Sequence, residues 1–250
     1  MFTKVKTDAE IKAMRESGRM LGEVLNILVA SADVGMTTKE LSNIASRELK
    51  ALGGKPAFLG YEGFKEVLCT SVNDAVVHGI PSPHFVLQDG DIVGLDFGVS
   101  YRGMITDAAR SVIVGTPKKS DAKLLQTTLE SLDAGIFAVR GGCKTGDIAA
   151  AVQAVLDRGP YGIVRDLVGH GVGHHVHEEP NIPNYGKAGT GPVLEAGMTI
   201  AIEPMATLGG WRVRQHQDGW TVLTADGSRS AHFEDTILIT EDGSEILTRV

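Results

Sequence analysis

Residues 91–115, DIVGLDFGVSYRGMITDAARSVIVG, contain the pattern that decides the fold. Two runs rich in apolar and β-branched residues flank the short segment Tyr101, Arg102 and Gly103. Such runs are typical of strands, and a tight glycine-containing turn between them predicts an antiparallel hairpin. The hairpin places one aspartate in each strand, Asp96 and Asp107, in an otherwise apolar setting.

Helical patterns precede the hairpin. Residues 8–32 have apolar side chains at helical spacing behind a capping box of Thr7 and Glu10. Residues 34–54 restart a helix with a threonine N-cap and stop it at a pair of glycines. Two helices are therefore expected before the hairpin.

The same order returns after the hairpin. Residues 120–140 are helical in pattern, and a second short helix starts with Thr145 as the predicted N-cap. Three strand-like runs follow: MTIAIEP, GWTVLTA and AHFEDTILIT. Between the helices and these strands lies a less regular, proline- and glycine-rich stretch, 158–197, which has the length of a functional loop.

The repeated order predicts an internal duplication. The second helices of the two halves are offset by about 108 residues. We therefore expect an α+β protein, with antiparallel sheet covered by helices, in which halves 8–116 and 120–245 form a single domain over 1–250.

Composition limits the class of protein. The chain has 250 residues, 24 Lys and Arg, 31 Asp and Glu, and a net charge of -7, which disfavours direct nucleic-acid binding. Its two cysteines are too few for a disulfide framework, so a reducing compartment is expected. The sequence shows no signal peptide and no membrane-spanning run, and a cytoplasmic location is predicted.

Asp96 and Asp107 are the first candidate site residues. If they lie opposite one another, their carboxylates share a face with Cβ atoms about 5 Å apart and repel. A buried pair of this kind needs a cation or a shared proton. Alternatively, one aspartate caps the turn and the other pairs with Arg102 or Arg110.

The second half adds three candidate ligands. Glu203 and Glu234 are lone acids inside apolar strands, which breaks the binary pattern. His170 lies in the glycine-flanked run LVGHGVGHHVHEEP. Four carboxylates and one imidazole match a centre of two metal ions bridged by carboxylates and water, and this ligand set suits Mn, Fe(II), Co or Zn.

Other chemistries have weaker support in the sequence. The glycines around His170 lack the third glycine of a dinucleotide-binding motif, and HExxH is missing. Cys69 and His78 could in principle form a nucleophile and base pair, but no nucleophile elbow is present.

Motifs over most of the chain resemble those of type I methionine aminopeptidases, members of the peptidase M24 family with the pita-bread fold. These motifs are NDAVVHGIP (73–81), DIVGLDFGVSYRGMITDAAR (91–110), GHGVGHHVHEEP (169–180), TIAIEPM (199–205) and DGWTVLTADGSRSAHFEDTILIT (218–240). The resemblance implies removal of the initiator methionine from nascent polypeptides when the next residue is small. The short spacing between His170 and Glu203 matches type I rather than type II.

The resemblance also implies roles for single residues. Asp96 binds one ion, Asp107 and Glu234 bridge both, and His170 with Glu203 completes the other ion. Glu203 also accepts a proton from the attacking water.

Two noncoordinating histidines have implied catalytic roles. His78 is expected beside the scissile amide nitrogen, and His177 beside the carbonyl oxygen. His174 and His175 are expected near the site or in solvent.

A methionine pocket is implied as well, lined by Phe58, Tyr61, Phe64, Cys69, Val176 and Trp220. The family often has a smaller residue near Phe58, Tyr near Phe64 and an aromatic residue near Val176, and these departures bear on the shape of the pocket.

The expected partners are nascent N-termini and the ribosome surface, for a monomer. Rival functions are an Xaa-Pro peptidase of the same fold, or a metal-free pita-bread binding protein. Prolidase-like enzymes carry a large N-terminal domain that this sequence does not show, and metal-free relatives lose ligands that are present here.

Overall fold

The computed structural model describes residues 1–250, and the predicted hairpin is its longest sheet element. β4 (Ile92–Tyr101) and β5 (Met104–Ile113) are antiparallel and pair from end to end. Arg102 and Gly103 between them both have positive φ, of 50° and 82°. A two-residue turn in which both residues have positive φ has a backbone twist that matches the right-handed twist of the flanking strands. The hairpin prediction is confirmed.

Two helices cover one face of this hairpin. α1 (Asp8–Ser31) and α2 (Thr38–Leu52) begin after Thr7 and Thr37, each of which closes a capping box, and α2 ends at the left-handed Gly53. Their apolar faces and the hairpin share a core of 18 buried residues. β1 (Lys55–Pro56) and β2 (Cys69–Val72) extend this sheet along the free edge of β4.

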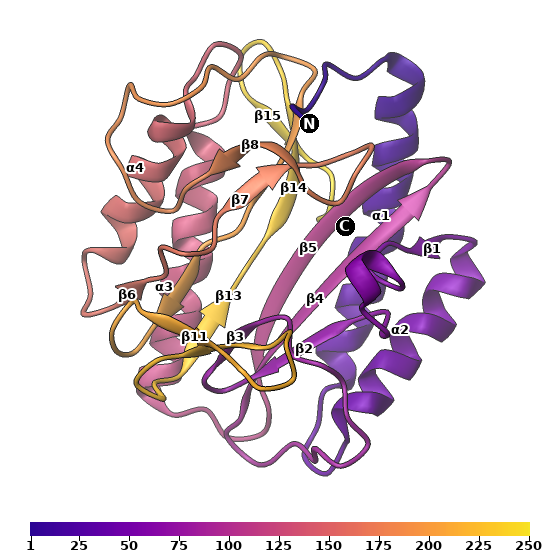
Figure 1. Cartoon of the computed structure of the whole chain (residues 1–250), viewed down its shortest axis with the longest axis vertical. Helices are drawn as coiled ribbons and strands as arrows, with labels where there is room; N and C mark the ends of the chain where they lie inside the picture. The colour runs from indigo at the N-terminus through magenta and orange to yellow at the C-terminus, as the bar shows by residue number, and fades with distance from the viewer.

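The second half repeats this arrangement around its own core. α3 (Lys119–Phe137) and α4 (Thr145–Leu156) pack with the second half's strands in a core of 20 buried residues. The five-stranded sheet has the order β15 (Ser244–Ile246), β14 (Asp235–Ile239), β9 (Thr199–Ile202), β7 (Gly169–Gly171) and β8 (Glu178–Ile182). Figure 1 shows α1 and α2 on one side of the molecule, α3 and α4 on the other, and the long strands between them.

Short elements complete the fold. They are η1 (Tyr61–Gly63), β3 (Ala75–Val77), β6 (Gly162–Ile163), β10 (Met205–Thr207), β11 (Val213–Gln215), β12 (Val222–Thr224) and β13 (Ser230–His232). The six strands among them form two three-stranded sheets, β13-β10-β6 and β11-β12-β3. None of the helices combines the length and apolar character that a bilayer crossing requires.

The two halves are joined where β5 meets the start of β14. Ala109 and Glu234 exchange backbone hydrogen bonds of 3.3 and 3.0 Å. Two residues away, the Thr236 hydroxyl accepts from the Asp107 N–H and donates to the Asp107 carbonyl. This junction brings Asp107 of the first half close to Glu234 of the second half.

Two details differ from the sequence predictions. Lys144, not Thr145, precedes the first turn of α4; Asp147 accepts the Lys144 N–H at 2.8 Å, so a threonine cap is not needed. Part of the expected loop 158–197 is strand, because β7 and β8 lie inside the five-stranded sheet. Gly169 permits this close pairing, since an added Cβ would lie 2.4 Å from the Ala201 carbonyl oxygen.

Candidate metal centre

Asp96 and Asp107 share a face of the hairpin but occupy different rungs of its ladder. Asp96 pairs with Ala109, and Asp107 pairs with Gly98. The directly opposed arrangement considered from the sequence is therefore wrong. Diagonal neighbours of this kind lie about 7–8 Å apart between Cα atoms, which leaves room for a cation between their carboxylates.

Both aspartates are buried without a protein cation to neutralise them. Burial raises the pKa of Asp96 to about 7 and raises that of Asp107 well above its usual range. The alternative of an arginine partner is wrong, because Arg110 pairs with Asp235 at 2.7 Å and Arg102 lies over the Tyr101 ring. One carboxylate oxygen of each aspartate has no hydrogen-bond partner.

Glu234 faces Asp107 across the junction of the halves. It is 2% exposed, and its Oε1 also lacks a partner. Burial, followed by the charge of Asp107, raises the pKa of Glu234 well above its usual range. With His170 these residues form a group in which one ligand atom from each lies within 4.8 Å of the others.

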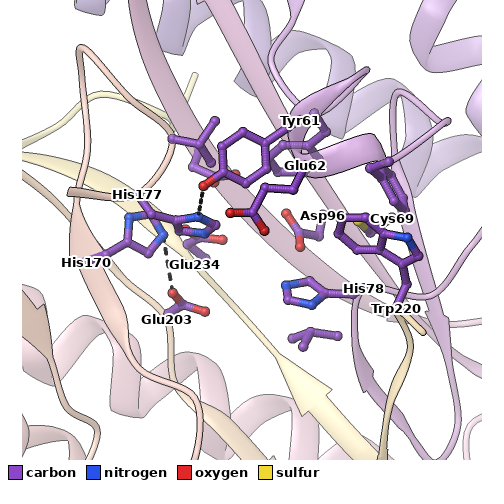
Figure 2. A pocket seen from close by; sticks show the side chains of 15 residues that line it. Tyr61, Glu62, Cys69, His78, Asp96, His170, His177, Glu203, Trp220 and Glu234 are labelled. Carbon is purple, nitrogen blue, oxygen red and sulfur yellow. Dashed lines mark hydrogen bonds and ion pairs between the residues drawn. The ribbon is translucent and has the colours of Figure 1, made fainter. Parts of the chain in front are cut away.

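His170 and Glu203 complete the set predicted from the sequence. β7 pairs His170 with Ala201 of β9, and Glu203 directly follows that strand. The distance from His170 Nε2 to Glu203 Oε1 is 3.5 Å. Figure 2 shows His170, Glu203 and Glu234 of the second half facing Asp96 and His78 of the first.

A sixth residue, His232, was missed by the sequence reasoning. Glu203, His232 and Glu234 form a second group of ligand atoms within 4.8 Å, which shares Glu234 with the first. The signal was available, because residues two apart in a strand point to the same face. His232 stands two residues before Glu234 in AHFEDTILIT.

The donor set fits divalent metal ions. Buried carboxylates are costly unless they are protonated or bound to a cation, and here three of them have oxygens without partners. Carboxylate oxygens mixed with imidazole nitrogens are ligands for Mn, Fe(II), Co and Zn. Two groups of ligand atoms that share Glu234 match a pair of ions. Asp96 belongs to neither group, although it lines the same cavity.

His78 and His177 line the cavity that the carboxylates also line, but they belong to neither group of ligand atoms. His78 has a left-handed backbone, with φ of 59°, and burial lowers its pKa. His177 keeps an exposed edge, yet the atoms packed around it, and next the nearby His170, lower its pKa to about 4. Its Nδ1 lies 2.9 Å from the Tyr61 hydroxyl (Figure 2).

A cavity of about 110 Å³ has the carboxylates and three histidines in one part of its wall and apolar side chains in another. All the residues predicted for the methionine pocket line it: Phe58, Tyr61, Phe64, Cys69, Val176 and Trp220. The Phe64 and Trp220 rings meet edge to face, with centroids 5.0 Å apart. Glu62, which the sequence reasoning did not select, also lines the cavity.

The rival pairing of Cys69 with His78 has no support in the geometry. No hydrogen bond joins the two residues, and burial raises the pKa of the Cys69 thiol well above its usual range. A thiol that stays protonated is a poor nucleophile. His174 does not line the cavity and lies 2.7 Å from Glu10, and His175 is exposed.

Comparison with known proteins gives one family. The profile of metallopeptidase family M24 matches residues 12–241. Methionine aminopeptidase of Clostridium acetobutylicum is 44% identical over 98% of each chain. Methionine aminopeptidase 1 of Bacillus subtilis is also 44% identical, over 98% of each chain.

Solved structures agree with these sequence matches. The crystal structure of methionine aminopeptidase from Thermotoga maritima superposes with a TM-score of 0.98 at 44% identity, over 100% of both chains. Prolidase from Pyrococcus furiosus shares the fold, with a TM-score of 0.79 at 24% identity over 98% of this chain and 65% of its own.

Proposed function

The chain belongs to metallopeptidase family M24, and we infer that it is a metal-dependent aminopeptidase that removes N-terminal methionine from peptides. One observation carries this function: a buried group of carboxylates and imidazoles lines the same cavity as a set of aromatic and apolar side chains. Relatives named methionine aminopeptidase, 40–45% identical over nearly the whole chain, support the same activity. The shared fold is the pita-bread fold expected from the sequence.

Two divalent ions are the proposed cofactors. Their ligands would be Asp96, Asp107, His170, Glu203 and Glu234, with Co, Mn, Fe(II) or Zn as the candidates. When bound, such ions supply Lewis acidity that polarises a carbonyl and lowers the pKa of water. The unpartnered oxygens of Asp96, Asp107 and Glu234 support this assignment.

The chain's own residues supply the remaining chemistry. Glu203, near the imidazoles of His170 and His232, would accept a proton from the attacking water. His78 borders the cavity from the first half and would donate to the scissile amide nitrogen as it leaves. His177, held by the Tyr61 hydroxyl, would hydrogen-bond the carbonyl oxygen as negative charge develops there.

Selectivity for methionine would come from the cavity. The aromatic rings in its wall offer favourable contacts to a thioether sulfur, and the apolar part of the wall disfavours burial of a charged side chain. A small second residue is the proposed requirement, because His78 and His177 border the position where that residue would enter.

Peptide N-termini are the substrates that an aminopeptidase requires. We propose that they belong to nascent chains, that the enzyme works in the cytoplasm as a monomer, and that it contacts the ribosome surface without binding nucleic acid directly. Both cysteines are free and buried, which fits a reducing compartment.

A peptide assay tests the function. Metal-stripped protein is incubated with Met-Gly-Met-Met, a Met-Pro substrate and an Ala-first control peptide, before and after addition of Mn(II) or Co(II). The expected result is metal-dependent release of methionine from Met-Gly-Met-Met, with no release of alanine from the control peptide. Cleavage only at proline would assign the chain to the Xaa-Pro branch, and no cleavage with any metal would indicate a binding protein.

A further inference from the structure

His232 is buried at the centre, and its Nε2 faces two carboxylates without making a hydrogen bond of good geometry to either. The residue is 3% exposed, and its Nε2 has no hydrogen-bond partner. Nε2 lies 3.4 Å from Glu203 Oε2 and 3.8 Å from Glu234 Oε2. Buried polar nitrogens are almost always hydrogen-bonded, so an unpartnered one between two carboxylates needs a physical reason.

The backbone of His232 is fixed firmly enough to aim this side chain. The Ser111 hydroxyl accepts the His232 N–H and donates to the His232 carbonyl oxygen, both at 2.9 Å. On the other side, His232 pairs with Met205 in the ladder of β10 and β13. The main chain from which the ring projects is therefore fixed by two elements before any ligand binds.

We propose that His232 is a further metal ligand, which binds through Nε2 to an ion that Glu203 and Glu234 also hold. The proposal rests on the metal centre of the proposed function and adds a sixth residue to its five ligands. The carboxylates of Glu203 and Glu234 and the imidazole of His232 form a group compact enough for one ion. The centre then has two imidazoles, His170 in one group and His232 in the other.

A second imidazole changes which metals the centre prefers. Imidazole suits Zn, Cu, Fe and Ni, whereas sites made of carboxylate and water suit Mn and Mg. Replacing His232 by an amide should therefore weaken Zn(II) binding by at least about tenfold. Mn(II) binding should weaken less.

Metal affinity alone does not show whether His232 binds the metal itself, because His232 could instead donate a hydrogen bond to the ligand Glu203. Loss of such a supporting bond also lowers metal affinity by about 10–100-fold. The decisive measurement is the bond between metal and nitrogen. A one-bond scalar coupling between ¹¹³Cd and an imidazole ¹⁵N exists only where the two atoms are directly bonded.

The experiment uses the full chain labelled with ¹⁵N-histidine, stripped of metal and titrated with ¹¹³Cd(II). Two histidine nitrogens should show coupling to cadmium in the wild type. His232→Gln should remove one of them and His170→Gln the other, while the control His78→Gln should keep both. A single coupled nitrogen in the wild type, or two that survive His232→Gln, would overturn the proposal.

Two further readouts keep the test decisive. If His232→Gln fails to fold, as judged by its amide spectrum, the wild-type count still decides, with His78→Gln and His177→Gln showing whether those rings account for the second coupling. Methionine release is measured separately. Coupling to His232 without peptide cleavage would support His232 as a metal ligand and contradict the proposed activity. Peptide cleavage without that coupling would support the activity and contradict His232 as a ligand.

Discussion

Asp107 lies opposite Gly98, and not opposite Asp96, in the ladder between β4 and β5. The rung that holds one carboxylate therefore has no side chain on the other strand. Phe58 occupies the space: a Cβ built on Gly98 would lie 2.6 Å from its Cε1 atom. Because Gly98 has no side chain, the Phe58 ring packs directly on the rung that holds Asp107 and forms part of the wall of the methionine pocket.

Gly98→Ala should disturb the pocket and leave the metal centre intact. The added methyl group must displace the Phe58 ring, which lines the cavity. We expect KM for methionine peptides to rise by about tenfold, the scale of one methylene in an apolar pocket. Steady-state kinetics and Zn(II) calorimetry measure the two effects.

The matched control is Gly94→Ala in the same strand. There the nearest atom to an added Cβ is the Ser71 carbonyl oxygen at 3.5 Å, an ordinary contact. Equal kinetic effects of the two substitutions would contradict the role of Phe58.

Glu234→Gln should lose metal and activity together, and Asp107→Asn should do the same. Both residues stand in the group with His170, and an amide removes a charged ligand oxygen. We expect metal affinity to fall by more than about 100-fold, beyond the loss typical of supporting residues. Added metal should raise Tm of the wild type but not of these variants.

The exposed Glu241→Gln serves as the control for removal of one surface carboxylate. Full activity in Asp107→Asn would count against the assignment of two metal ions.

His78→Ala should leave metal bound and slow turnover. His78 borders the cavity but belongs to neither group of ligand atoms. Loss of one positioned hydrogen-bond donor typically lowers kcat by about 10²–10³-fold. Calorimetry gives the metal stoichiometry and single-turnover kinetics give the chemical step, with the exposed His84→Ala as control. A loss of metal in His78→Ala would move this residue into the ligand set.

Local patterns were sufficient to predict the helices, the hairpin and most of the centre. The capping box at Thr7 and a threonine N-cap at position 37 or 38 predicted the starts of α1 and α2, and two β-rich runs around a tight turn predicted the hairpin. The lone acids in apolar strands, Glu203 and Glu234, do lie at the centre. Each of these signals is carried by neighbours in sequence, where side-chain spacing follows directly from helix or strand geometry.

Register and long-range placement could not be predicted in the same way. The rung of Asp96 depends on a turn of two residues, and one residue more or less would shift every pair. The position of His232 two residues before Glu234 could be seen in the sequence, but its approach to Glu203 comes only from the folded chain. β7 was taken as loop because its glycines, Gly169 and Gly171, are poor strand formers, and only the packed sheet explains them.

Glu10 should make the stability of the protein depend on pH in the acid range. Its carboxylate accepts from the Thr7 N–H and lies 2.7 Å from His174 Nε2. The Thr7 hydrogen bond, followed by that of His174, lowers its pKa from 4.5 to about 2. A lowered pKa means that the contribution is present above pH 4.5 and is lost as the pH falls towards 2.

The free energy of unfolding of metal-free wild type should therefore fall more steeply between pH 4.5 and pH 3 than that of Glu10→Gln. Urea titrations at fixed pH measure the difference, with the exposed Glu195→Gln as control. Parallel curves for wild type and Glu10→Gln would show that the capping carboxylate contributes no such dependence.

Lys6 and Glu178 should be strongly coupled in stability, because they form a buried ion pair that ties the N-terminal segment to the turn carrying His177. Their charged atoms are 3.7 Å apart, and their side chains are 0% and 3% exposed. Glu178 Oε1 also accepts the backbone N–H groups of His174 and His175.

Lys6→Met leaves the Glu178 carboxylate buried without its partner and should destabilise the fold by about 3–5 kcal/mol in urea titration. Adding Glu178→Gln removes the stranded charge and keeps an oxygen for the two N–H groups, so the double variant should recover much of the loss. If the double variant is no more stable than Lys6→Met alone, the two charges are not coupled, and the segment is held by its backbone hydrogen bonds, Thr3 N–H to the Glu179 carbonyl and Lys6 N–H to the Gly197 carbonyl.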